Sequence, residues 1–323
     1  MDKGRMECWD QNSQAVSVRF PRIMIAAEKS GGGKTLFTCA LLSLLKEKIQ
    51  EVRAFKCGPD YIDPMFHRTV LEIPSRNLDS FFADGDTLRY LLGREVLEME
   101  KFPESRIAVL EGVMGFYDGL GGVSERSSAW EMADLTDTPV ILLVDMKGRS
   151  LSALASIKGF LDYKEKSHVT GVIFNRLSPM LYPGLKERAE RELGIRVFGY
   201  VPELKDLTLE SRHLGLVMPE EIPGILKRLD LIKEKVRVGI DLDGIIEEAG
   251  RAAEIVVKLP EAAGWSLSDR IPKKTVVAVA KDEAFCFYYE DNLDLLKKLG
   301  AEIQYFSPIH DRNLPEGTCA VYL

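Results

Sequence analysis

The sequence of 323 residues contains no run of about eighteen consecutive apolar residues, which is the length that a membrane-spanning helix needs. Its start, MDKGRMECWDQNSQ, lacks the apolar core of a signal peptide and predicts a polar tail over residues 1–20. Basic residues are not in excess, because 43 lysines and arginines stand against 50 acidic residues and the net charge is −7. These absences argue against a membrane protein and against a nucleic-acid-binding protein.

Cysteine and histidine are scarce and scattered. No CxxC spacing occurs, so the sequence predicts neither a disulfide framework nor a zinc site, and free thiols fit a cytoplasmic localisation. We expect a structural role for each of the four histidines, and this expectation is weakest for His67. The five cysteines are Cys8, Cys39, Cys57, Cys286 and Cys319.

Short apolar runs alternate with longer amphipathic segments along most of the chain. RIMIAA, RIAVLEG and PVILLVD are apolar at almost every position, as strands buried on both faces are. Helical patterns such as KTLFTCALLSLLKEK lie between them. The repeated strand–helix–strand order predicts an α/β fold, with a mostly parallel sheet and helices on both faces.

Changes in composition predict the domain boundaries. The sheet domain is expected over residues 21–218, and the charged amphipathic runs of residues 219–273 predict a helical extension and linker. A new strand–helix–strand pattern starts at TVVAVA and fills residues 274–323. Because about fifty residues are few for an independent domain, we expect this last unit to be incomplete.

The stretch AAEKSGGGKT predicts a phosphate-binding loop between a strand and a helix, and hence a sheet of the P-loop NTPase type with ATP as cosubstrate. The strict GxxxxGK[ST] pattern fails only at Glu28. Lys34 is expected to reach the β- and γ-phosphates, and the Thr35 hydroxyl to coordinate Mg²⁺. Small loop residues let backbone N–H groups approach phosphates at a helix N-terminus. These residues are Ser30, Gly31, Gly32 and Gly33.

A second lysine, Lys29, stands within the loop, and such a residue marks one branch of switch-like ATPases. It predicts either contact with a nucleotide across a homodimer or an exposed surface residue. A ParA- or MinD-like switch ATPase is therefore an alternative function. The acidic loops described next, the lack of a basic patch and the lack of a terminal amphipathic anchor argue against it.

Acidic residues follow two further predicted strands. In FKCGPDYIDPMFH, Pro64 and the proline before Asp60 argue against a regular helix, so Asp60 and Asp63 are expected in a loop. VLEGVMGFYDGLGG places Glu111 at the tip of another strand and Asp118 in a glycine-rich loop. The carboxyl edge of an open α/β sheet is where ligands bind, and Mg²⁺ prefers one or two carboxylates together with phosphate oxygens.

Four motifs, FKCGPDYIDPMFH, PSRNLDSFF, LEGVMGFYDG and DEAFCFYYEDNLDLL, resemble the cobyrinic acid a,c-diamide synthase family. The resemblance runs from about residue 21 to the last residue. That family is similar to dethiobiotin synthetase in its ATP domain and carries a flavodoxin-like class I glutamine amidotransferase domain.

The resemblance implies a ligase of cobalamin biosynthesis. It implies that ATP phosphorylates the c and then the a acetate carboxylate of cobyrinic acid, and that glutamine-derived ammonia displaces phosphate from each acyl phosphate. The same chemistry on nickel sirohydrochlorin is the alternative.

The resemblance also implies roles for single residues. Lys56 is expected to neutralise the γ-phosphate or the attacking carboxylate, and Asp60 and Glu111 to join Thr35 as Mg²⁺ ligands.

Residues near the substrates are implied in the same way. Tyr61, Asp63 and Asp118 are expected to position the substrate carboxylates, with Asp63 and Asp118 taking part in catalysis. Asn175 resembles the asparagine that contacts the adenine edge in related ATPases, and a turn residue at a strand end is the alternative.

The last unit resembles only the first two strands and helix of the amidotransferase domain. Cys286 and Cys319 lack the glycine-flanked elbow of a nucleophile, so we predict a structural role for both. We therefore expect ammonia itself, or a separate glutaminase partner, to supply the nitrogen, and no reaction with glutamine alone.

Overall fold

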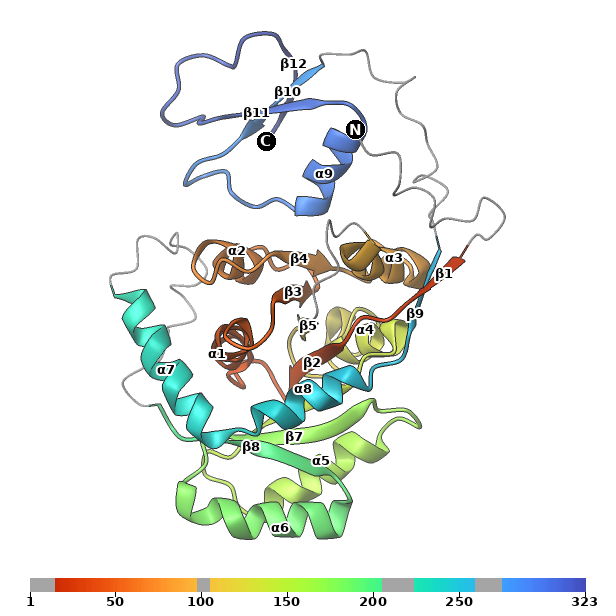
Figure 1. The fold of residues 1–323 in the computed structure, drawn as a ribbon, viewed down its shortest axis with the longest axis vertical. Coiled ribbons are helices and arrows are strands. Elements are labelled where there is room, and N and C mark those ends of the chain that lie inside the picture. Colours follow the sequence, from red (N-terminus) through yellow and green to blue (C-terminus); the bar gives the residue numbers. More distant parts are fainter. Residues whose placement is uncertain (1–14, 98–104, 205–223, 259–274) are drawn as a thin grey trace. The chain divides into compact units, whose positions relative to one another are not determined.

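The computed structural model describes residues 15–97, 105–204, 224–258 and 275–323. The chain divides into two compact units, residues 1–258 and residues 259–323 (Figure 1). The predicted boundaries at residues 218 and 273 both lie outside the described residues.

The first unit is built on one sheet of seven parallel strands in the order β4-β3-β5-β2-β6-β7-β8. Strand β2 lies inside the sheet, and the chain runs from it first to one edge and then to the other. Loops at the carboxyl end of β2 therefore lie at the switch point of the topology, where open α/β sheets bind ligands. The strands are β2 (Arg22–Ala27), β3 (Glu51–Cys57), β4 (Ser75–Leu78), β5 (Arg106–Glu111), β6 (Val140–Asp145), β7 (Val169–Asn175) and β8 (Arg196–Val201).

Helices cover both faces of this sheet, as predicted. One face packs against α1 (Lys34–Lys46), α2 (Ile62–Thr69), α7 (Ile225–Gly239) and α8 (Leu242–Gly250). The other face packs against α3 (Gly85–Leu97), α4 (Ala129–Thr136), α5 (Ser152–Asp162) and α6 (Tyr182–Leu193). Among the described residues, the short 3₁₀ helices η2 (Leu120–Gly122) and η3 (Pro179–Leu181) lie in the connections.

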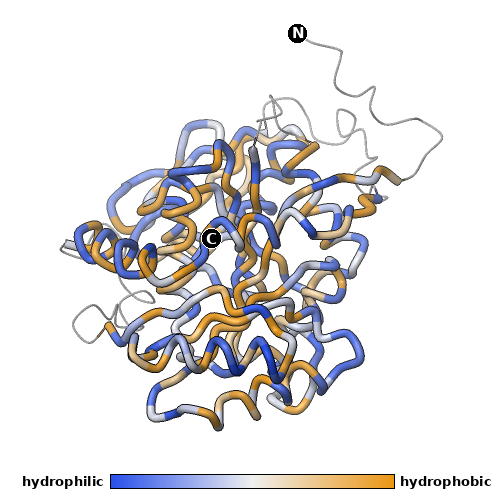
Figure 2. The backbone as a smooth tube through the Cα atoms, turned by 60° about the horizontal axis from the view of Figure 1, so that its bottom comes forward, coloured by the Kyte–Doolittle hydropathy of each residue, from blue (hydrophilic) through white to orange (hydrophobic). Residues whose placement is uncertain are grey.

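Strand β2 shows why its sequence is apolar at almost every position. Met24 and Ala26 pack into one core, whereas Ile23 and Ile25 pack into the other, and all four side chains are fully buried. Successive residues of a strand point to opposite faces, so a strand covered on both sides needs apolar residues throughout. Figure 2 shows hydrophobic residues gathered along such central segments of the chain.

Strand β1 (Ala15–Val18) pairs antiparallel with β9 (Ile255–Lys258). We predicted a polar tail over residues 1–20. For residues 15–18 the structure instead gives a strand. Val18 is buried in the core that also contains α3. Residues 1–14 of the predicted tail lie outside the described residues.

The second unit contains a parallel three-stranded sheet in the order β11-β10-β12, together with helix α9 (Glu290–Lys298). Its strands are β10 (Val276–Ala280), β11 (Glu302–Phe306) and β12 (Thr318–Tyr322). Val277, Val279 and Leu293 form the centre of a separate small core. Across the described ranges of both units, no helix is long and apolar enough to cross a membrane.

Candidate active site

The phosphate-binding loop connects β2 to α1 at the carboxyl end of the sheet. Gly31 and Gly33 have φ values of +70° and +90°, a region that residues with a side chain rarely enter. A Cβ atom at Gly33 would also lie 2.5 Å from Nδ2 of Asn175. Glycine at this position is therefore required by both the backbone conformation and the neighbouring side chain.

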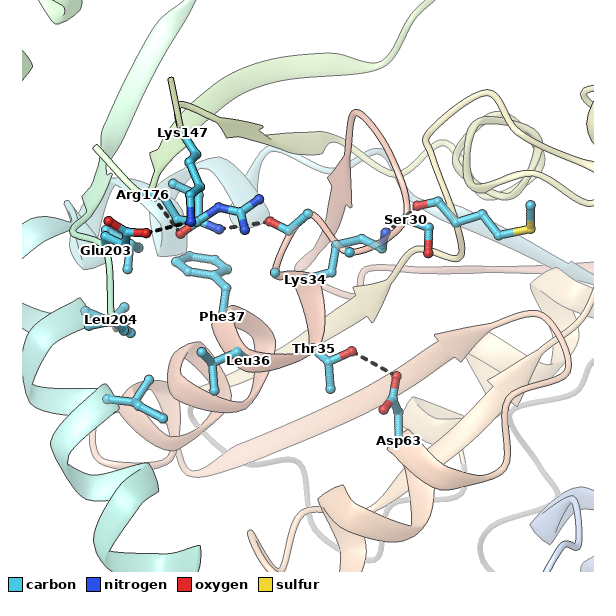
Figure 3. Close-up of a pocket in the computed structure, with 18 of the residues that line it drawn as sticks. Ser30, Lys34, Thr35, Leu36, Phe37, Asp63, Lys147, Arg176, Glu203 and Leu204 are labelled. Atoms are coloured by element: carbon cyan, nitrogen blue, oxygen red, sulfur yellow. Dashed lines mark hydrogen bonds and ion pairs between the residues drawn. The ribbon is translucent and has the colours of Figure 1, made fainter. Parts of the chain in front are cut away.

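A pocket of about 950 Å³ lies over this loop (Figure 3). Ligand pockets of roughly 300–1,000 Å³ are typical of small-molecule sites, so this one has room for a nucleotide. It brings together residues that the sequence predicted from three separate motifs. The predicted site residues that line it are Ser30, Gly31, Gly32, Gly33, Lys34, Thr35, Lys56, Asp60, Asp63 and Asn175.

Next to the loop, Thr35, Lys56, Asp63 and Glu111 form what we call the acidic cluster. Lys56 Nζ lies 2.5 Å from Asp63 Oδ2 and 2.9 Å from Glu111 Oε1. Thr35 Oγ1 donates to the same Glu111 oxygen at 2.7 Å and to Asp63 Oδ2 at 3.2 Å. Figure 3 shows the Thr35 and Asp63 side chains turned toward one another. The parallel register pairs Lys56 of β3 directly with Glu111 of β5, which explains why these two residues meet.

Burial and charge act in opposite directions within the acidic cluster. Burial lowers the pKa of Lys56, but the carboxylates of Glu111, Asp63 and Asp60 outweigh burial and raise that pKa above its ordinary value. Burial and the nearby Glu111 raise the pKa of Asp63, and Lys56 opposes this rise. The cluster therefore keeps one cation between two buried carboxylates.

Lys34, the lysine of the GKT motif, is nearly buried and donates to the carbonyl oxygen of Met114. Burial, followed by the charge of Lys56, lowers the pKa of Lys34 to about 8. Two lysines at one pocket repel each other, and an anionic ligand between them would relieve that repulsion. The arrangement is thus suited to a polyphosphate.

Helix α2 corrects one prediction. We expected Asp63 in a loop because of the nearby prolines, but α2 begins at Ile62 and includes both Asp63 and Pro64. Pro64 lies in the first turn, where the backbone N–H has no partner within the helix, so proline is tolerated there. Asp60 Oδ1 accepts the N–H groups of Ile62 at 3.0 Å and Asp63 at 3.3 Å and so stabilises the start of the helix.

The Thr35 hydroxyl and the Glu111 carboxylate have the chemistry that Mg²⁺ requires, since both are oxygen donors beside the phosphate-binding loop. Glu111 is fully buried, and its Oε2 atom has no hydrogen-bond partner among the described residues. Asp60 lies farther from Lys56 than Asp63 and Glu111 do, with its Oδ2 atom 3.7 Å from Lys56 Nζ. No group of three or more His, Cys, Asp or Glu residues within the described ranges could hold a metal by itself. The residues present thus fit an ion that also binds nucleotide phosphates, as Mg²⁺ commonly does.

Two predicted substrate residues do not line the large pocket. Tyr61 directly precedes α2. Asp118 accepts the N–H of Gly115 at 3.1 Å and lines a smaller hollow of about 440 Å³ with Tyr117 and Phe160. A Cβ atom at Gly115 would lie 2.3 Å from Asp118 Oδ2, so glycine permits this close approach.

Asn175, at the end of β7, ties that strand to the loop. Its Nδ2 donates to the Gly32 carbonyl at 2.9 Å, and its Oδ1 accepts the N–H of Arg176 at 3.0 Å. Both contacts are to backbone atoms, as expected of a residue that shapes a turn. Contact with adenine, the other predicted role, stays a prediction.

Several pocket residues were missed by sequence reasoning. Lys147 and Glu203 form an ion pair of 2.9 Å at one end of the pocket, and Figure 3 shows them near Arg176 and Phe37. Lys147, Arg176 and Glu203 follow the ends of β6, β7 and β8 respectively. The rule that drew attention to the acidic loops, namely that ligands bind past the carboxyl ends of strands, would also have found them.

Glu28, which departs from the loop consensus, has a structural role. Its carboxylate accepts from Arg149 Nη1 at 2.8 and 3.0 Å and from the backbone N–H of Asp145 at 3.1 Å. The neighbouring Lys29 lies 3.2 Å from Asp145 Oδ2 and leaves 63% of its side chain exposed. Glu28 therefore fixes the loop to the end of β6, and Lys29 lies at the surface of this chain.

Residues 23–217 match the model of one family, the CobQ/CobB/MinD/ParA nucleotide-binding domain. This match covers the loop, the acidic cluster and the whole seven-stranded sheet apart from Arg22. The chain belongs to that family. Membership confirms a nucleotide-binding domain and so implies the use of ATP.

Curated relatives agree with the sequence resemblance. The chain is 38% identical over 297 residues to cobyrinate a,c-diamide synthase of Listeria monocytogenes, covering 91% of this chain and 63% of the relative. It is 37% identical over 307 residues to cobyrinate a,c-diamide synthase of Thermoplasma volcanium, covering 95% of this chain and 64% of the relative. The chain thus spans less than two thirds of the length of these relatives.

Among solved structures, the cell division protein FtsY of Thermotoga maritima is similar with a TM-score of 0.43 and 15% identity. The similarity covers 75% of this chain and 72% of that one.

Proposed function

We propose that this chain catalyses the ATP-dependent amidation of the a and c acetate carboxylates of cobyrinic acid, by way of acyl phosphates. The observation that carries the proposal is the acidic cluster beside the phosphate-binding loop, in a chain similar to enzymes named cobyrinate a,c-diamide synthase. A carboxylate is a poor acyl donor because an oxide leaves badly, whereas phosphate leaves well. The use of ATP to activate a carboxylate therefore accounts for the buried charges of the acidic cluster beside the nucleotide site.

In the first step, a substrate carboxylate oxygen attacks the γ-phosphorus of ATP, and ADP leaves. Such transfer depends mainly on positioning and on neutralising charge. Lys34 and the loop N–H groups bind the phosphates, and Lys56 stabilises the charge that gathers between the γ-phosphate and the carboxylate. Thr35 and Glu111 would hold Mg²⁺, which supplies further charge neutralisation when bound.

In the second step, ammonia attacks the carbonyl carbon of the acyl phosphate. The carbon–oxygen bond to phosphate breaks, the departing phosphate takes up the proton that the nitrogen loses, and an amide and inorganic phosphate remain. Asp63 and Asp118 orient the substrate carboxylates and accept hydrogen bonds from the incoming nitrogen. Tyr61, which directly precedes α2, contacts the macrocycle.

A variant of Lys56 tests whether this residue stabilises the charge that develops during phosphoryl transfer. We expect Lys56→Met to lower kcat for amide formation with ammonium by about 10²- to 10³-fold, the cost of losing one donor at a developing charge. Lys158→Ala removes an exposed lysine of α5 and serves as the control for loss of a positive charge. If Lys56→Met keeps more than a tenth of the activity of the parent, Lys56 is not the stabilising group.

A separate experiment tests which macrocycle is the substrate. Turnover of cobyrinic acid should exceed turnover of nickel sirohydrochlorin under the same conditions with ATP, Mg²⁺ and ammonium. The reverse order would assign the same chemistry to the nickel tetrapyrrole.

A further inference from the structure

His67 is a buried side chain that the proposed mechanism does not use. It lies on α2 four residues after Asp63, so both side chains lie on one face of the helix. That face meets the acidic cluster: His67 Nε2 lies 3.9 Å from Glu111 Oε2. His67 and Glu111 both have no measurable exposure to solvent.

The two facing atoms are both without a hydrogen bond. Neither His67 Nε2 nor Glu111 Oε2 has a partner within the part of the chain that the structure describes. Buried polar atoms almost always have partners, so two such atoms that face each other call for an explanation. A shift of about 1 Å would bring them to hydrogen-bond distance.

The contact of the other ring nitrogen is compatible with a hydrogen on Nε2. His67 Nδ1 lies 3.1 Å from the hydroxyl oxygen of Ser75, which is itself buried on β4. A hydroxyl can donate or accept, whereas a carboxylate can only accept. If the Ser75 hydroxyl donates to Nδ1, the hydrogen of a neutral imidazole lies on Nε2 and points to Glu111.

We propose that His67 is a positioning residue for Glu111, and this inference rests on the proposed role of Glu111 in holding Mg²⁺. The Nε2–H group directs Oε2 of the carboxylate, and Oε1 therefore stays turned toward Thr35 and Lys56, at 2.7 and 2.9 Å. Groups that orient a ligand in this way commonly change metal affinity by about 10- to 100-fold when they are removed.

Two amide variants separate the two nitrogens of the ring. The amide nitrogen of His67→Gln can occupy the place of Nε2, which preserves a donor toward Glu111. His67→Asn can reach only the place of Nδ1, so it keeps the contact with Ser75 and loses the one with Glu111. The readout is the Mg²⁺ concentration that gives half-maximal binding of a non-hydrolysable ATP analogue, measured by calorimetry without any corrinoid.

We expect His67→Asn to raise this Mg²⁺ concentration by about 10- to 100-fold and His67→Gln to raise it less than about threefold. The same Mg²⁺ concentration for His67→Asn, His67→Gln and the parent would overturn the inference. An equal rise in the two variants would also overturn it, because it would indicate a role of His67 in packing alone. The melting temperature without ligand is recorded for each variant to identify such a loss.

Ser75→Ala provides a test that keeps the imidazole, should the His67 variants not fold. Loss of the hydroxyl frees the ring to place its hydrogen on Nδ1, so the Mg²⁺ concentration should rise at least about threefold. An unchanged value contradicts the inference. Because corrinoid is absent from these measurements, a chain that binds Mg²⁺ and nucleotide normally but forms no amide would refute the proposed function alone.

Discussion

At the scale of the residue, Glu28 connects the phosphate-binding loop to the end of β6 through Arg149. The Glu28 side chain is only 8% exposed, and Arg149 Nη1 contacts both of its oxygens. Removal of the guanidinium leaves a carboxylate that is buried without its cation. The loop consensus has its first glycine at the position of Glu28, so it gives no hint of this contact.

We expect Arg149→Ala to lower the free energy of unfolding by about 1.5–3 kcal/mol, the value of a hydrogen bond to a charged group. Urea denaturation measures this change. Lys158→Ala, which removes an exposed lysine of α5, is the control for loss of a positive charge. A loss below about 0.5 kcal/mol for Arg149→Ala, the usual range of surface substitutions, would show that the contact does not stabilise the loop.

At the scale of the element, helix α3 lies so close to β9 that only glycine fits at residue 93. A Cβ atom at Gly93 would lie 2.2 Å from Cγ2 of Val257. Val257 is fully buried, so it has little room to move. This contact joins two elements that are far apart in the sequence.

We expect Gly93→Ala to lower the free energy of unfolding by about 1–2 kcal/mol, although alanine favours helices, because overpacking costs about 1–3 kcal/mol. Val257→Ala in the same chain should recover at least about 1 kcal/mol in a double-mutant cycle. Gly159→Ala in α5 is the control, since no atom lies within 4 Å of its added Cβ, and it should stabilise by about 0.5–1 kcal/mol. Equal effects of the two glycine substitutions would contradict the close contact.

The elements differ in how well the sequence predicted them. The parallel sheet followed from apolar runs such as β2, and the acidic cluster followed from strand ends, because parallel strands bring their carboxyl ends to one edge. Pairing of β1 with β9 depends on residues far apart in the chain, and no local pattern encodes it. The start of α2 was missed because Pro64 was taken as a helix breaker, whereas it lies in the first turn.

Within the site, the motifs predicted which residues take part but not which of them contact one another. Lys56 and Glu111 meet because register pairs β3 with β5, and register cannot be counted from one strand alone. The approach of His67 to Glu111 depends on how α2 packs, which periodicity does not specify. The roles carried over from the resemblance stay predictions.

At the scale of the whole molecule, the two units have separate cores, and the phosphate-binding loop belongs to residues 1–258. A ligand that binds only the folded state stabilises it by about 2.7 kcal/mol at one hundred times its Kd. We therefore expect Mg²⁺ with an ATP analogue to raise the melting temperature of this unit by about 5–10 °C. Differential scanning calorimetry measures the shift, and Lys34→Ala should abolish it. The same shift in Lys34→Ala would place the nucleotide elsewhere.

The central claim is that ATP activates a substrate carboxylate. Its most direct test uses cobyrinic acid labelled with oxygen-18 in its acetate carboxylates, together with unlabelled ATP, Mg²⁺ and ammonium. Mass spectrometry of the inorganic phosphate then follows the oxygen that leaves the acyl phosphate. Transfer of one labelled oxygen to phosphate for each amide formed is the result that we predict. Phosphate without label, formed at the same rate as the amide or without any amide, would contradict the account.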